Sequence, residues 1–544
     1  MTNKEILKIE NLSCILKVNG LKIVDNVSFT IKHGETIALL GESGVGKTTL
    51  FRAILQLLPR SVWETTGNIY LGGMRINDLP PKELEKVRGR VARCIFQEPG
   101  QSLNPSLKIE TQLKEAITTV SPEMSEEKLD KVIKAALKNG GLKDPSLIDN
   151  RYPGDLSGGQ RQRVGISMTL SCPCDILLAD EPSNSLDAVT VTELVQSLKN
   201  LKKSKHIGSI LCVTHDLSVV SALNCERVLF MHAGKMYEAG SIQNVLKNPS
   251  AHEQLEELVS LAKKIDRHGK IAEINQERRK RENMLSIKDL NFGFLVKSFL
   301  KKERPLVVKD VSFDVGKREF IGLVGSSGSG KSTIGSIVSR LLSGYMGEIK
   351  YNGKSIIDFN AKDKIKFHRS LQVVFQDPAD TFDPAITMNQ NLEECFKAIG
   401  MTKSEIGESV AKLLKLLSLD KRLLNELPGN LSGGQKQRFA LLRAFGSTPS
   451  VIIADEPFTH LDLISQNRMI EYMQMRKKSA VEPMGCILIS HEIGIVAKLC
   501  DRIIVVDDGY IVEDNTAYNV VNSPVHKATQ KLIGAAKMLG TMAS

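Results

Sequence analysis

The chain has 544 residues, 42% of them hydrophobic and 25% charged, and its formal net charge is +11. This length allows about two to four domains, and the composition is that of an ordinary globular protein, which excludes disordered and fibrous classes. No apolar run approaches the roughly 20 residues of a membrane helix, and the first residues lack a signal-peptide pattern, so we expect no membrane span.

The first element with a chemical signature is a glycine-rich loop between a strand and a helix. Residues 36–40 form a short apolar run that predicts a buried strand, and helical periodicity follows the loop as far as Leu58. This context is typical of a phosphate-binding loop, because backbone N–H groups converge on phosphate at a helix N-terminus. The lysine would reach the β and γ oxygens, and the first threonine would bind Mg²⁺. The candidate residues are Gly41, Ser43, Gly44, Gly46, Lys47, Thr48 and Thr49.

Further along the first half, Gln97 is followed by an amphipathic stripe and a glycine-rich pentapeptide. The stripe predicts helical core packing, and its members are Leu129, Val132, Ile133, Ala136 and Leu137. The pentapeptide Leu-Ser-Gly-Gly-Gln opens a helix, so a hydroxyl and free backbone N–H groups lie at a positive helix end. This second phosphate-binding surface has no lysine, which makes sense if it completes a site begun elsewhere. Its residues are Ser157, Gly158, Gly159 and Gln160.

The next two strands carry the acidic and the imidazole candidates. Residues 175–179 predict a buried strand that ends in the adjacent carboxylates Asp180 and Glu181. The Asp can hold the Mg²⁺ shell while the Glu orients and polarises an attacking water. Strand 209–213 leads to His215, and because a matched histidine recurs later, we predict a γ-phosphate contact rather than a structural role.

The second half repeats these elements in the same order, beginning with strand 320–324. A repeat of this length indicates a duplicated domain, since solenoid units are much shorter. Strands 451–454 and 486–489 precede the second carboxylates and the second histidine, and another helical stripe comprises Ile406, Val410, Leu413, Leu414 and Leu417. The repeated candidates are Gly325, Ser327, Gly328, Gly330, Lys331, Ser332, Thr333, Gln376, Ser432, Gly433, Gly434, Gln435, Asp455, Glu456 and His491.

Between the halves, residues 263–283 carry eight basic and four acidic side chains. We interpret this segment as a solvated linker; the alternative is weak attraction to an anionic membrane surface, and nucleic acid is disfavoured because no aromatics are interleaved. The nine cysteines are scattered, and the pair Cys172 and Cys174 lacks a second pair for a zinc site. We therefore expect reduced thiols in a cytoplasmic protein.

With these motifs together, the chain resembles an ABC transporter ATPase with two fused nucleotide-binding domains. The resemblance covers nearly all of the chain, and the ordered set of phosphate loop, Gln, LSGGQ, Asp-Glu and His is highly specific. It implies an α/β fold in which each P-loop domain has a RecA-like parallel-sheet core, an antiparallel β subdomain and a helical subdomain. The expected domains are 1–262, with a helical subdomain at about 98–165, and 284–544, with one at about 377–440, joined by the linker 263–283.

The resemblance also implies that the halves pair head to tail and sandwich each ATP between them. The first phosphate loop, with Gln97, Asp180, Glu181 and His215, would face Ser432 and Gly434. The second, with Gln376, Asp455, Glu456 and His491, would face Ser157 and Gly159. The implied catalytic residues are the two Glu and the two His, the implied cofactors are ATP and Mg²⁺, and the implied metal ligands are Thr48, Gln97, Asp180, Ser332, Gln376 and Asp455.

Smaller signs resemble the oligopeptide, dipeptide and nickel importer group. Phe-Gln-Glu-Pro at 96–99 is followed by Ser-Leu-Asn-Pro at 102–105, and the second half echoes both segments. A Pro-x-His-like segment follows the last strand of each half, at Pro249 to His252 and Pro524 to His526, without the usual Pro-Tyr-Thr continuation. The cysteine cluster of some relatives is absent, so we predict no iron–sulphur centre.

Two departures from the family pattern predict unequal ATP sites. The adenine-stacking aromatic is expected at Phe294 in the second half, whereas the first half offers only Ile15 or Leu16. The residue before Leu-Asp is usually small, which Ser185 satisfies and His460 does not. Both sites keep a catalytic Glu, so we expect two working but unequal sites.

We weigh two functions. The first is an ATPase motor at the cytoplasmic face of the cell membrane that powers an importer for peptides, nickel or metal complexes. It would require two permease subunits, different from each other, and indirectly an extracytoplasmic substrate-binding protein; no nucleic acid partner is expected.

The alternative is a soluble tandem ATPase acting on ribosomes, but the linker is short for the helical arm of that group. A DNA-repair ATPase would need zinc modules or long coiled coils, and none is visible. The family resemblance is the basis of this preference.

Overall fold

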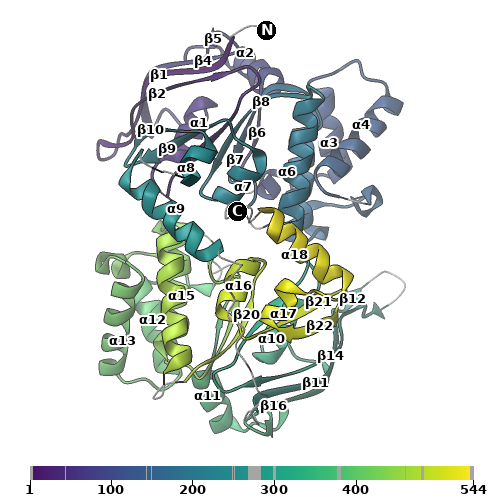
Figure 1. Cartoon of the computed structure of the whole chain (residues 1–544), viewed down its shortest axis with the longest axis vertical. Helices are drawn as coiled ribbons and strands as arrows, with labels where there is room; N and C mark the ends of the chain where they lie inside the picture. The colour runs from purple at the N-terminus through teal and green to yellow at the C-terminus, as the bar shows by residue number, and fades with distance from the viewer. Residues whose placement is uncertain are drawn as a thin grey trace. The chain divides into compact units, whose positions relative to one another are not determined.

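The computed structural model describes residues 4–539 apart from 43, 98, 143, 149, 185, 248, 250, 267–282, 298–301, 377–380, 460 and 480–482. Two compact units follow each other along the chain, formed mainly by residues 1–262 and 263–537 (Figure 1). Most of the expected linker lies outside the described residues, and its first residues belong to helix α9 (Glu253–Asp266). Among the described residues, no helix combines the length and the apolar character needed to cross a bilayer.

Each half contains a six-stranded sheet with five parallel strands and one antiparallel edge strand. The strand order is β10-β9-β3-β8-β7-β6 in the first half, and the second half has the equivalent order β22-β21-β15-β20-β19-β18. The strands are β3 (Thr36–Leu40), β6 (Ala92–Ile95), β7 (Cys174–Asp180), β8 (Ile207–Thr214), β9 (Arg227–His232), β10 (Lys235–Gly240), β15 (Phe320–Val324), β18 (Leu371–Val374), β19 (Val451–Asp455), β20 (Gly485–Ile489), β21 (Arg502–Asp507) and β22 (Tyr510–Thr516).

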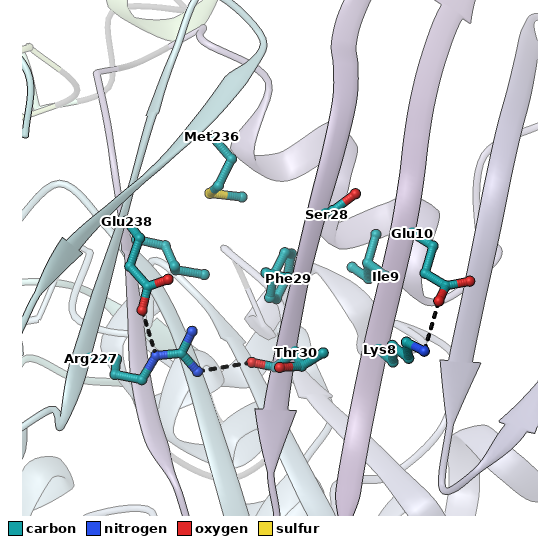
Figure 2. A pocket seen from close by; sticks show the side chains of 10 residues that line it. Lys8, Ile9, Glu10, Ser28, Phe29, Thr30, Arg227, Met236 and Glu238 are labelled. Atoms are coloured by element: carbon teal, nitrogen blue, oxygen red, sulfur yellow. Dashed lines mark hydrogen bonds and ion pairs between the residues drawn. The ribbon is translucent and has the colours of Figure 1, made fainter.

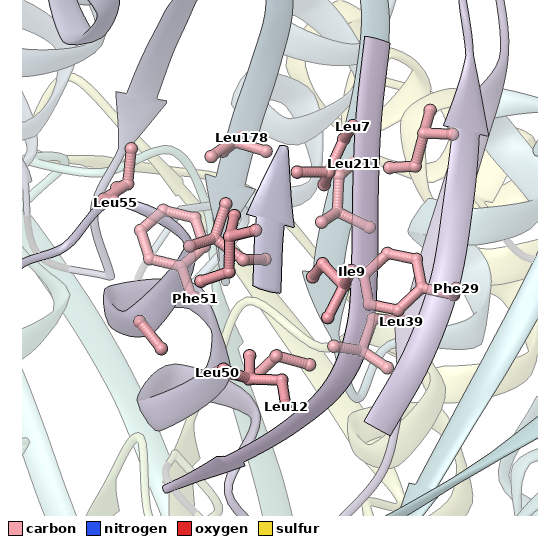
Figure 3. Close-up of a cluster of buried hydrophobic side chains, with 14 of the residues drawn as sticks. Leu7, Ile9, Leu12, Phe29, Leu39, Leu50, Phe51, Leu55, Leu178 and Leu211 are labelled. Carbon is pink, nitrogen blue, oxygen red and sulfur yellow. The ribbon is translucent and has the colours of Figure 1, made fainter. Parts of the chain in front are cut away.

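A four-stranded antiparallel sheet packs against each parallel sheet, in the orders β2-β1-β4-β5 and β14-β11-β16-β17. Figure 3 shows Phe51 of α1 in the first core, with Ile9 of β1, Leu39 of β3 and Leu178 of β7. The second half adds a short hairpin, β12-β13. The bounds are β1 (Glu5–Leu16), β2 (Leu21–Lys32), α1 (Lys47–Ile54), β4 (Trp63–Leu71), β5 (Met74–Arg75), β11 (Asn283–Gly293), β12 (Val296–Lys297), β13 (Lys302–Glu303), β14 (Leu306–Gly316), α10 (Lys331–Val338), β16 (Met346–Tyr351) and β17 (Lys354–Ser355).

A helical part follows the glutamine segment of each half, and in the first half its buried side chains form a separate core cluster. Both predicted stripes face inward, because every member is buried except Val132, which is partly buried. The helices are α2 (Pro81–Lys86), α3 (Ile109–Thr118), α4 (Glu126–Asn139), α5 (Gly158–Leu170), α6 (Ala188–Lys203), α7 (Leu217–Leu223), α11 (Ala361–Ser370), α12 (Met388–Ala398), α13 (Lys403–Leu416), α14 (Gly433–Gly446), α15 (Leu463–Lys478) and α16 (Ile493–Leu499). The expected α/β fold with parallel, antiparallel and helical parts is confirmed.

Helix α1 ends earlier than the sequence predicted. We expected helix as far as Leu58, but α1 ends at Ile54. Gln56 adopts a left-handed conformation with φ 53°, and the N–H of Leu57 donates to the carbonyl of Arg52 at 2.8 Å. This closing turn is a Schellman motif made without glycine. Arg340 closes α10 in the same way with φ 64°.

Each half closes with two helices after its edge strand. They are α8 (Ile242–Lys247) and α9 in the first half, and α17 (Ala517–Asn522) and α18 (Lys527–Leu539) in the second. The two Pro-x-His-like segments have a local role in starting α9 and α18. The Nδ1 atoms of His252 and His526 accept hydrogen bonds from the N–H groups two residues later, each at 3.2 Å.

Candidate active sites

The strand order brings the candidate residues of each half to one edge of its parallel sheet. Strand β8 lies between β3 and β7, with Leu40 opposite Thr214 and Asp180 opposite Val213. The phosphate loop leaves β3, the carboxylates end β7 and the histidine follows β8, so all three lie at the carboxyl ends of adjacent parallel strands. Ligands of open α/β sheets bind at this edge. Strands β15, β20 and β19 repeat the arrangement in the second half.

The lysine of each loop is buried and held by the loop's own carbonyl groups. Lys47 Nζ donates to the carbonyl oxygens of Gly41 at 2.7 Å and Glu42 at 2.8 Å. It also lies 4.0 Å from Oε1 of Glu181. Burial lowers the pKa of Lys47, while the charge of Glu181 opposes that shift. Lys331 Nζ has equivalent contacts with the carbonyls of residues 325 and 326 and also donates to Ser329 Oγ at 3.3 Å.

Glycine is required where each loop turns into its helix. Gly46 has φ 106° and Gly330 has φ 103°, which are left-handed conformations that disfavour other residues. A Cβ at Gly46 would lie 2.6 Å from the carbonyl oxygen of Ile23, and one at Gly330 would lie 2.8 Å from that of Val307. The backbone therefore approaches the antiparallel sheet more closely than any side chain allows, and α1 and α10 begin with their N-termini at the carboxyl edge.

Asp180 and the loop threonine form a hydrogen-bonded pair, and Asp455 and Ser332 form its counterpart. Burial and the adjacent charge of Glu181 raise the pKa of Asp180 to about 6. Burial likewise raises the pKa of Asp455 to about 6. One buried carboxylate oxygen of each Asp, Oδ1, has no hydrogen-bond partner. A buried oxygen of this kind needs a partner, and a hydroxyl beside a carboxylate with an open oxygen fits the preference of a hard divalent cation for oxygen ligands.

Glu181 directly follows β7 in a strained backbone conformation with φ 50°, and Glu456 follows β19 with φ 48°. The N–H of Glu181 donates to the carbonyl of Val213 at 2.8 Å, which connects this bend to β8. The His215 ring lies beside the carboxylate, with Nδ1 2.9 Å from Oε2, and the Thr214 hydroxyl donates to the same oxygen at 3.3 Å. Non-glycine residues at positive φ are often found at functional sites.

The electrostatics of this pair keep Glu181 ionised. Burial alone would raise the pKa of Glu181, but the charge and hydrogen bond of His215 outweigh it and lower that pKa. Burial alone would lower the pKa of His215, but Glu181 outweighs it and raises that pKa. In the second half, His491 Nδ1 lies 2.8 Å from Glu456 Oε1, and the same oxygen accepts the His491 N–H at 3.0 Å. An oriented carboxylate beside a phosphate loop can accept a proton from an attacking water.

The pentapeptides begin helices, as the sequence predicted. Ser157 caps α5, where its hydroxyl accepts from the N–H of Gln160 at 3.2 Å and the Gln160 side chain accepts from the Ser157 N–H at 2.9 Å. Ser432 and Gln435 form the same capping box on α14. The side chains of Ser157 and Ser432 are exposed, as are Gly158 and Gly433, so each helix presents its first turn to solvent.

The structure shows the exposure of the other predicted residues, or does not describe them. Gln97 and Gln376 are exposed, each two residues beyond the end of its strand. Phe294 is 47% exposed, and its ring packs edge-on against Phe292 with centroids 5.1 Å apart. Ile15, within β1, is partly buried. The predicted residues that lie outside the described ranges are Ser43, Ser185 and His460.

Sequence reasoning missed several side chains that support the site. Thr214 donates to Glu181 and Ser490 donates to Glu456, and their matched places before the two histidines were a readable signal. Arg163 of α5 donates to Thr190 Oγ1 at 2.5 Å, and Arg443 of α14 donates to the carbonyl of Thr381 at 2.7 Å. These arginines carried no signal, because their contacts join segments that are distant in sequence.

A separate hollow of about 490 Å³ lies away from the carboxyl edge in the first half, between β1, β2, β9 and β10 (Figure 2). Its charged groups are already paired: Arg227 bonds Glu238 at 3.0 Å and the carbonyl of Thr30 at 3.0 Å, and Lys8 bonds Glu10 at 2.7 Å. The hollow therefore offers a ligand few unsatisfied polar groups.

The chain is similar to several known proteins. A profile of the ABC transporter family matches residues 24–184 and 308–459, together more than half of the chain. The glutathione import ATP-binding protein GsiA of Salmonella paratyphi A is 31% identical, and the match covers 98% of this chain and 90% of that protein. The peptidoglycan transport ATP-binding protein YejF of Agrobacterium fabrum is 32% identical, covering 98% and 96%. The ABC transporter ATP-binding protein YejF of Escherichia coli K12 is 32% identical, covering 97% and 99%. A solved dimeric ATP-binding cassette with bound ADP and Pi is 26% identical, covering 43% of this chain and 99% of that one, with a TM-score of 0.39.

Proposed function

The chain belongs to the ABC transporter family and hydrolyses ATP, and from that premise we propose that it powers the import of peptide-like cargo through separate permease subunits. One observation carries the proposal: each half holds a complete set of loop lysine, paired hydroxyl and carboxylate, and histidine-bound Glu at one sheet edge. Two such sets in one chain supply both ATPase domains. In this proposal they act at the cytoplasmic face of the membrane, beside the permease subunits.

Each ATP is bound between the two halves in this proposal. The phosphate loop with Lys47 is completed by the turn at Ser432, and the loop with Lys331 is completed by the turn at Ser157. Support comes from the exposure of both turns and from the absence of any lysine in them. The first N–H groups of a helix have no partner within the helix, so each turn can receive a phosphate. A tether of about twenty residues would keep the halves at an effective concentration near millimolar.

Mg²⁺ would bind with each ATP. Thr48 and Asp180 would hold it in the first half, and Ser332 and Asp455 would hold it in the second. Support comes from the hydroxyl–carboxylate pairs and from the buried Oδ1 atoms that lack partners. The ion would neutralise charge on the β and γ phosphates, while Glu181 or Glu456 orients the attacking water. Gln97 and Gln376 would be further ligands of the ion, as the family resemblance implies.

Two different permease subunits dock on the helical parts. Support comes from a hollow of about 530 Å³ between α12 and α13, with the buried side chains of Ile406, Val410 and Leu414 at its floor. Gly407 and Ala411 leave the hollow open, and a Cβ at Gly407 would meet nothing within 4 Å. Its charged lining comprises Lys397, Lys403, Lys415, Lys421 and Glu393, of which Glu393 pairs with Lys397 at 2.8 Å.

The matching face of α4 is chemically different. Asp130 and Lys134 take the places of Gly407 and Ala411, and both are exposed. The second half therefore suits an apolar ridge flanked by carboxylates, whereas the first half suits a partner of mixed charge. Unlike surfaces favour unlike partners.

The cargo is peptide-like. Support comes from relatives named for glutathione and for peptidoglycan, each matched over at least nine-tenths of its length. Both names denote molecules that contain short peptides. Nickel and metal–chelator complexes are the other cargo class of this importer group, and transport assays with labelled peptide and labelled nickel distinguish the two. An extracytoplasmic binding protein would deliver the cargo.

The test is to purify a tagged chain from native membranes in mild detergent. We expect two different multi-span proteins to copurify, and ATP hydrolysis to depend on Lys47 and Lys331. Copurification with ribosomes, without membrane proteins, would overturn the importer in favour of the translation alternative. Hydrolysis that survives Lys47→Ala and Lys331→Ala together would overturn the ATP-site assignment.

A further inference from the structure

A buried glutamine of α14 contacts the backbone just after Glu456. Gln437 lies five positions after the helix cap Ser432, and its side chain is fully buried. Its Nε2 atom donates to the carbonyl oxygen of Pro457 at 3.0 Å. Pro457 is buried too, and it directly follows Glu456. The amide of Gln437 therefore holds the chain one residue beyond the carboxylate that we assign to the attacking water.

The bend at Glu456 needs support of this kind. Glu456 has φ 48°, whereas a residue before proline ordinarily takes an extended conformation with negative φ. Such strain persists only where the surrounding contacts hold it. Before the side chain, the N–H of Glu456 donates to the carbonyl of Ile489 at 2.9 Å. After the side chain, Gln437 binds the Pro457 carbonyl, so the bend is held on both sides.

The amide group of Gln437 is unfavourable for stability in one respect. Its Oε1 atom is buried and has no hydrogen-bond partner in the part of the chain that the structure describes. A buried polar atom without a partner destabilises a fold, and an apolar side chain of similar shape would not have one. What the amide supplies in return is its donor to Pro457. The position of this donor beside the bend indicates a role at the site.

The equivalent glutamine of the first half holds a different part of the turn. Gln162 lies five positions after Ser157, and its Nε2 atom donates to the carbonyl oxygen of Asn184 at 2.6 Å. Asn184 closes the turn, because its N–H donates to the carbonyl of Glu181 at 3.1 Å. This contact lies three residues after Glu181, whereas that of Gln437 lies one residue after its Glu.

We propose that Gln437 is a positioning residue for Glu456. Its hydrogen bond fixes the backbone from which the carboxylate projects, while His491 Nδ1, 2.8 Å from Glu456 Oε1, holds the carboxylate itself. The proposal rests on the role proposed above for Glu456 in orienting the attacking water. Gln437 takes no part in the chemistry, and its effect is confined to the hydrolytic step of its own half.

The test uses the full chain in a Glu181→Gln background, where the remaining hydrolysis occurs at the Glu456 site. Gln437→Leu removes the donor and the unpaired oxygen together. We expect kcat to fall about tenfold, the upper range of one hydrogen bond, with KM for ATP little changed. The melting temperature should also change little. An unchanged kcat with a lower melting temperature, or a raised KM at constant kcat, would overturn the proposal.

Gln437→Glu gives a readout that a merely structural role would not move. Burial raises the pKa of a carboxyl group, and only the neutral form can donate to the Pro457 carbonyl. Its kcat relative to that of the Gln437 chain should therefore be partly kept at about pH 6 and decline towards about pH 8. If Gln437→Leu does not fold, this variant carries the test alone, and a constant ratio would overturn the proposal.

The matched control is Gln162→Leu in a Glu456→Gln background, which reports on the Glu181 site. Because the contact of Gln162 lies further from its Glu, we expect a smaller loss of kcat, about two- to threefold. An equal loss from both leucine variants would overturn the assignment to the contact beside the carboxylate. Failure of the proposed role of Glu456 would appear differently: adding Glu456→Gln to Glu181→Gln would then leave hydrolysis unchanged.

Discussion

The loop lysines Lys47 and Lys331 bind equivalent loop carbonyls in the two halves, and Glu181 and Glu456 each have a histidine and a hydroxyl neighbour. In contrast, helices α5 and α14 contact the rest of their halves through arginines at different positions, Arg163 and Arg443. The parallel strands at the carboxyl edge have equivalent order and register in both halves. The helical parts differ in the residues exposed on α4 and α13 and in the arginine contacts of α5 and α14. Hydrolysis has narrow geometric demands, whereas surfaces away from the carboxyl edge can diverge after duplication.

The largest effect is expected from removing the proposed catalytic carboxylates, Glu181 and Glu456, one at a time. Glu181→Gln and Glu456→Gln each keep size and hydrogen bonding but cannot accept a proton, so we expect at least about a 100-fold loss at the altered site. Because we expect Phe294 to stack on adenine in the second half, where the first half has Ile15 or Leu16, the residual rates should differ, and Glu456→Gln should lose more at low ATP. Steady-state and single-turnover assays measure this. Equal residual rates at every ATP concentration would contradict the inequality of the sites.

A second change tests the difference between the helical surfaces. Gly407→Asp with Ala411→Lys transplants the first-half pair into the hollow of the second half. Both positions are exposed on α13, so folding should be unaffected, while two charged side chains would enter the docking surface. We expect copurification of one permease to fall about tenfold or more, because charged groups are costly to bury against an apolar partner.

The matched control for that change is Asp130→Gly with Lys134→Ala in the first half. It should affect the other permease. If both double variants lose the same permease, or neither loses any, the assignment of one partner to each half is wrong. Quantitative mass spectrometry of the purified complex distinguishes these results, and an unchanged melting temperature shows that the helices remain intact.

Adenine recognition gives a smaller expected effect. Phe294→Ala should weaken ATP binding at the second site by about two- to tenfold, the range of one aromatic stacking contact. Leu16→Ala should change binding at the first site by less, since no π face is lost. Binding of a fluorescent ATP analogue to the full chain, with the other loop lysine replaced, measures each site alone. A larger loss from Leu16→Ala would reverse the expected inequality.

Much of the fold could be predicted because the duplicated motifs identify equivalent strands in the two halves. Strands β3 and β15 match their predicted bounds, since each is an apolar run closed by glycine. The predicted end of α1 was wrong because Gln56 terminates the helix in a left-handed conformation, which is usually adopted by glycine or asparagine. The positive φ of Glu181 was equally unreadable, because tertiary contacts with β8 impose it.

The candidate site was predictable where chemistry demands particular residues at fixed spacing. The loop lysines, the carboxylates and the histidines lie together as expected. Arg163 and Arg443 could not be assigned, because an arginine in an amphipathic helix has no signature until its distant partner is known. The pairing of each loop with the opposite serine–glycine turn stays a prediction that rests on the family resemblance.

The smallest effect tests whether the two proposed Mg²⁺ positions are alike. The pKa of Asp180 and that of Asp455 both lie at about 6, above the ordinary 3.8, because burial disfavours the ionised form. The neutral form therefore prevails below pH 6, and a protonated carboxyl competes with Mg²⁺ for its oxygen. We expect Mg²⁺ affinity, measured by calorimetry with a nonhydrolysable ATP analogue, to fall about twofold between pH 7 and pH 6 and more steeply below. Above pH 7 it should be flat.

Asp180→Asn and Asp455→Asn each remove one titrating group and should flatten half of this pH dependence. The same group contributes to stability with the opposite sign: a carboxyl whose folded pKa is raised favours the folded state most when protonated, so its contribution declines as pH rises from about 4 to 6. In the unaltered chain, Mg²⁺ affinity should therefore rise with pH over this range, while the contribution of these carboxyls to folding stability falls. If only one Asn variant alters the Mg²⁺ profile, the two proposed Mg²⁺ positions differ although the described geometry around Asp180 and Asp455 is equivalent.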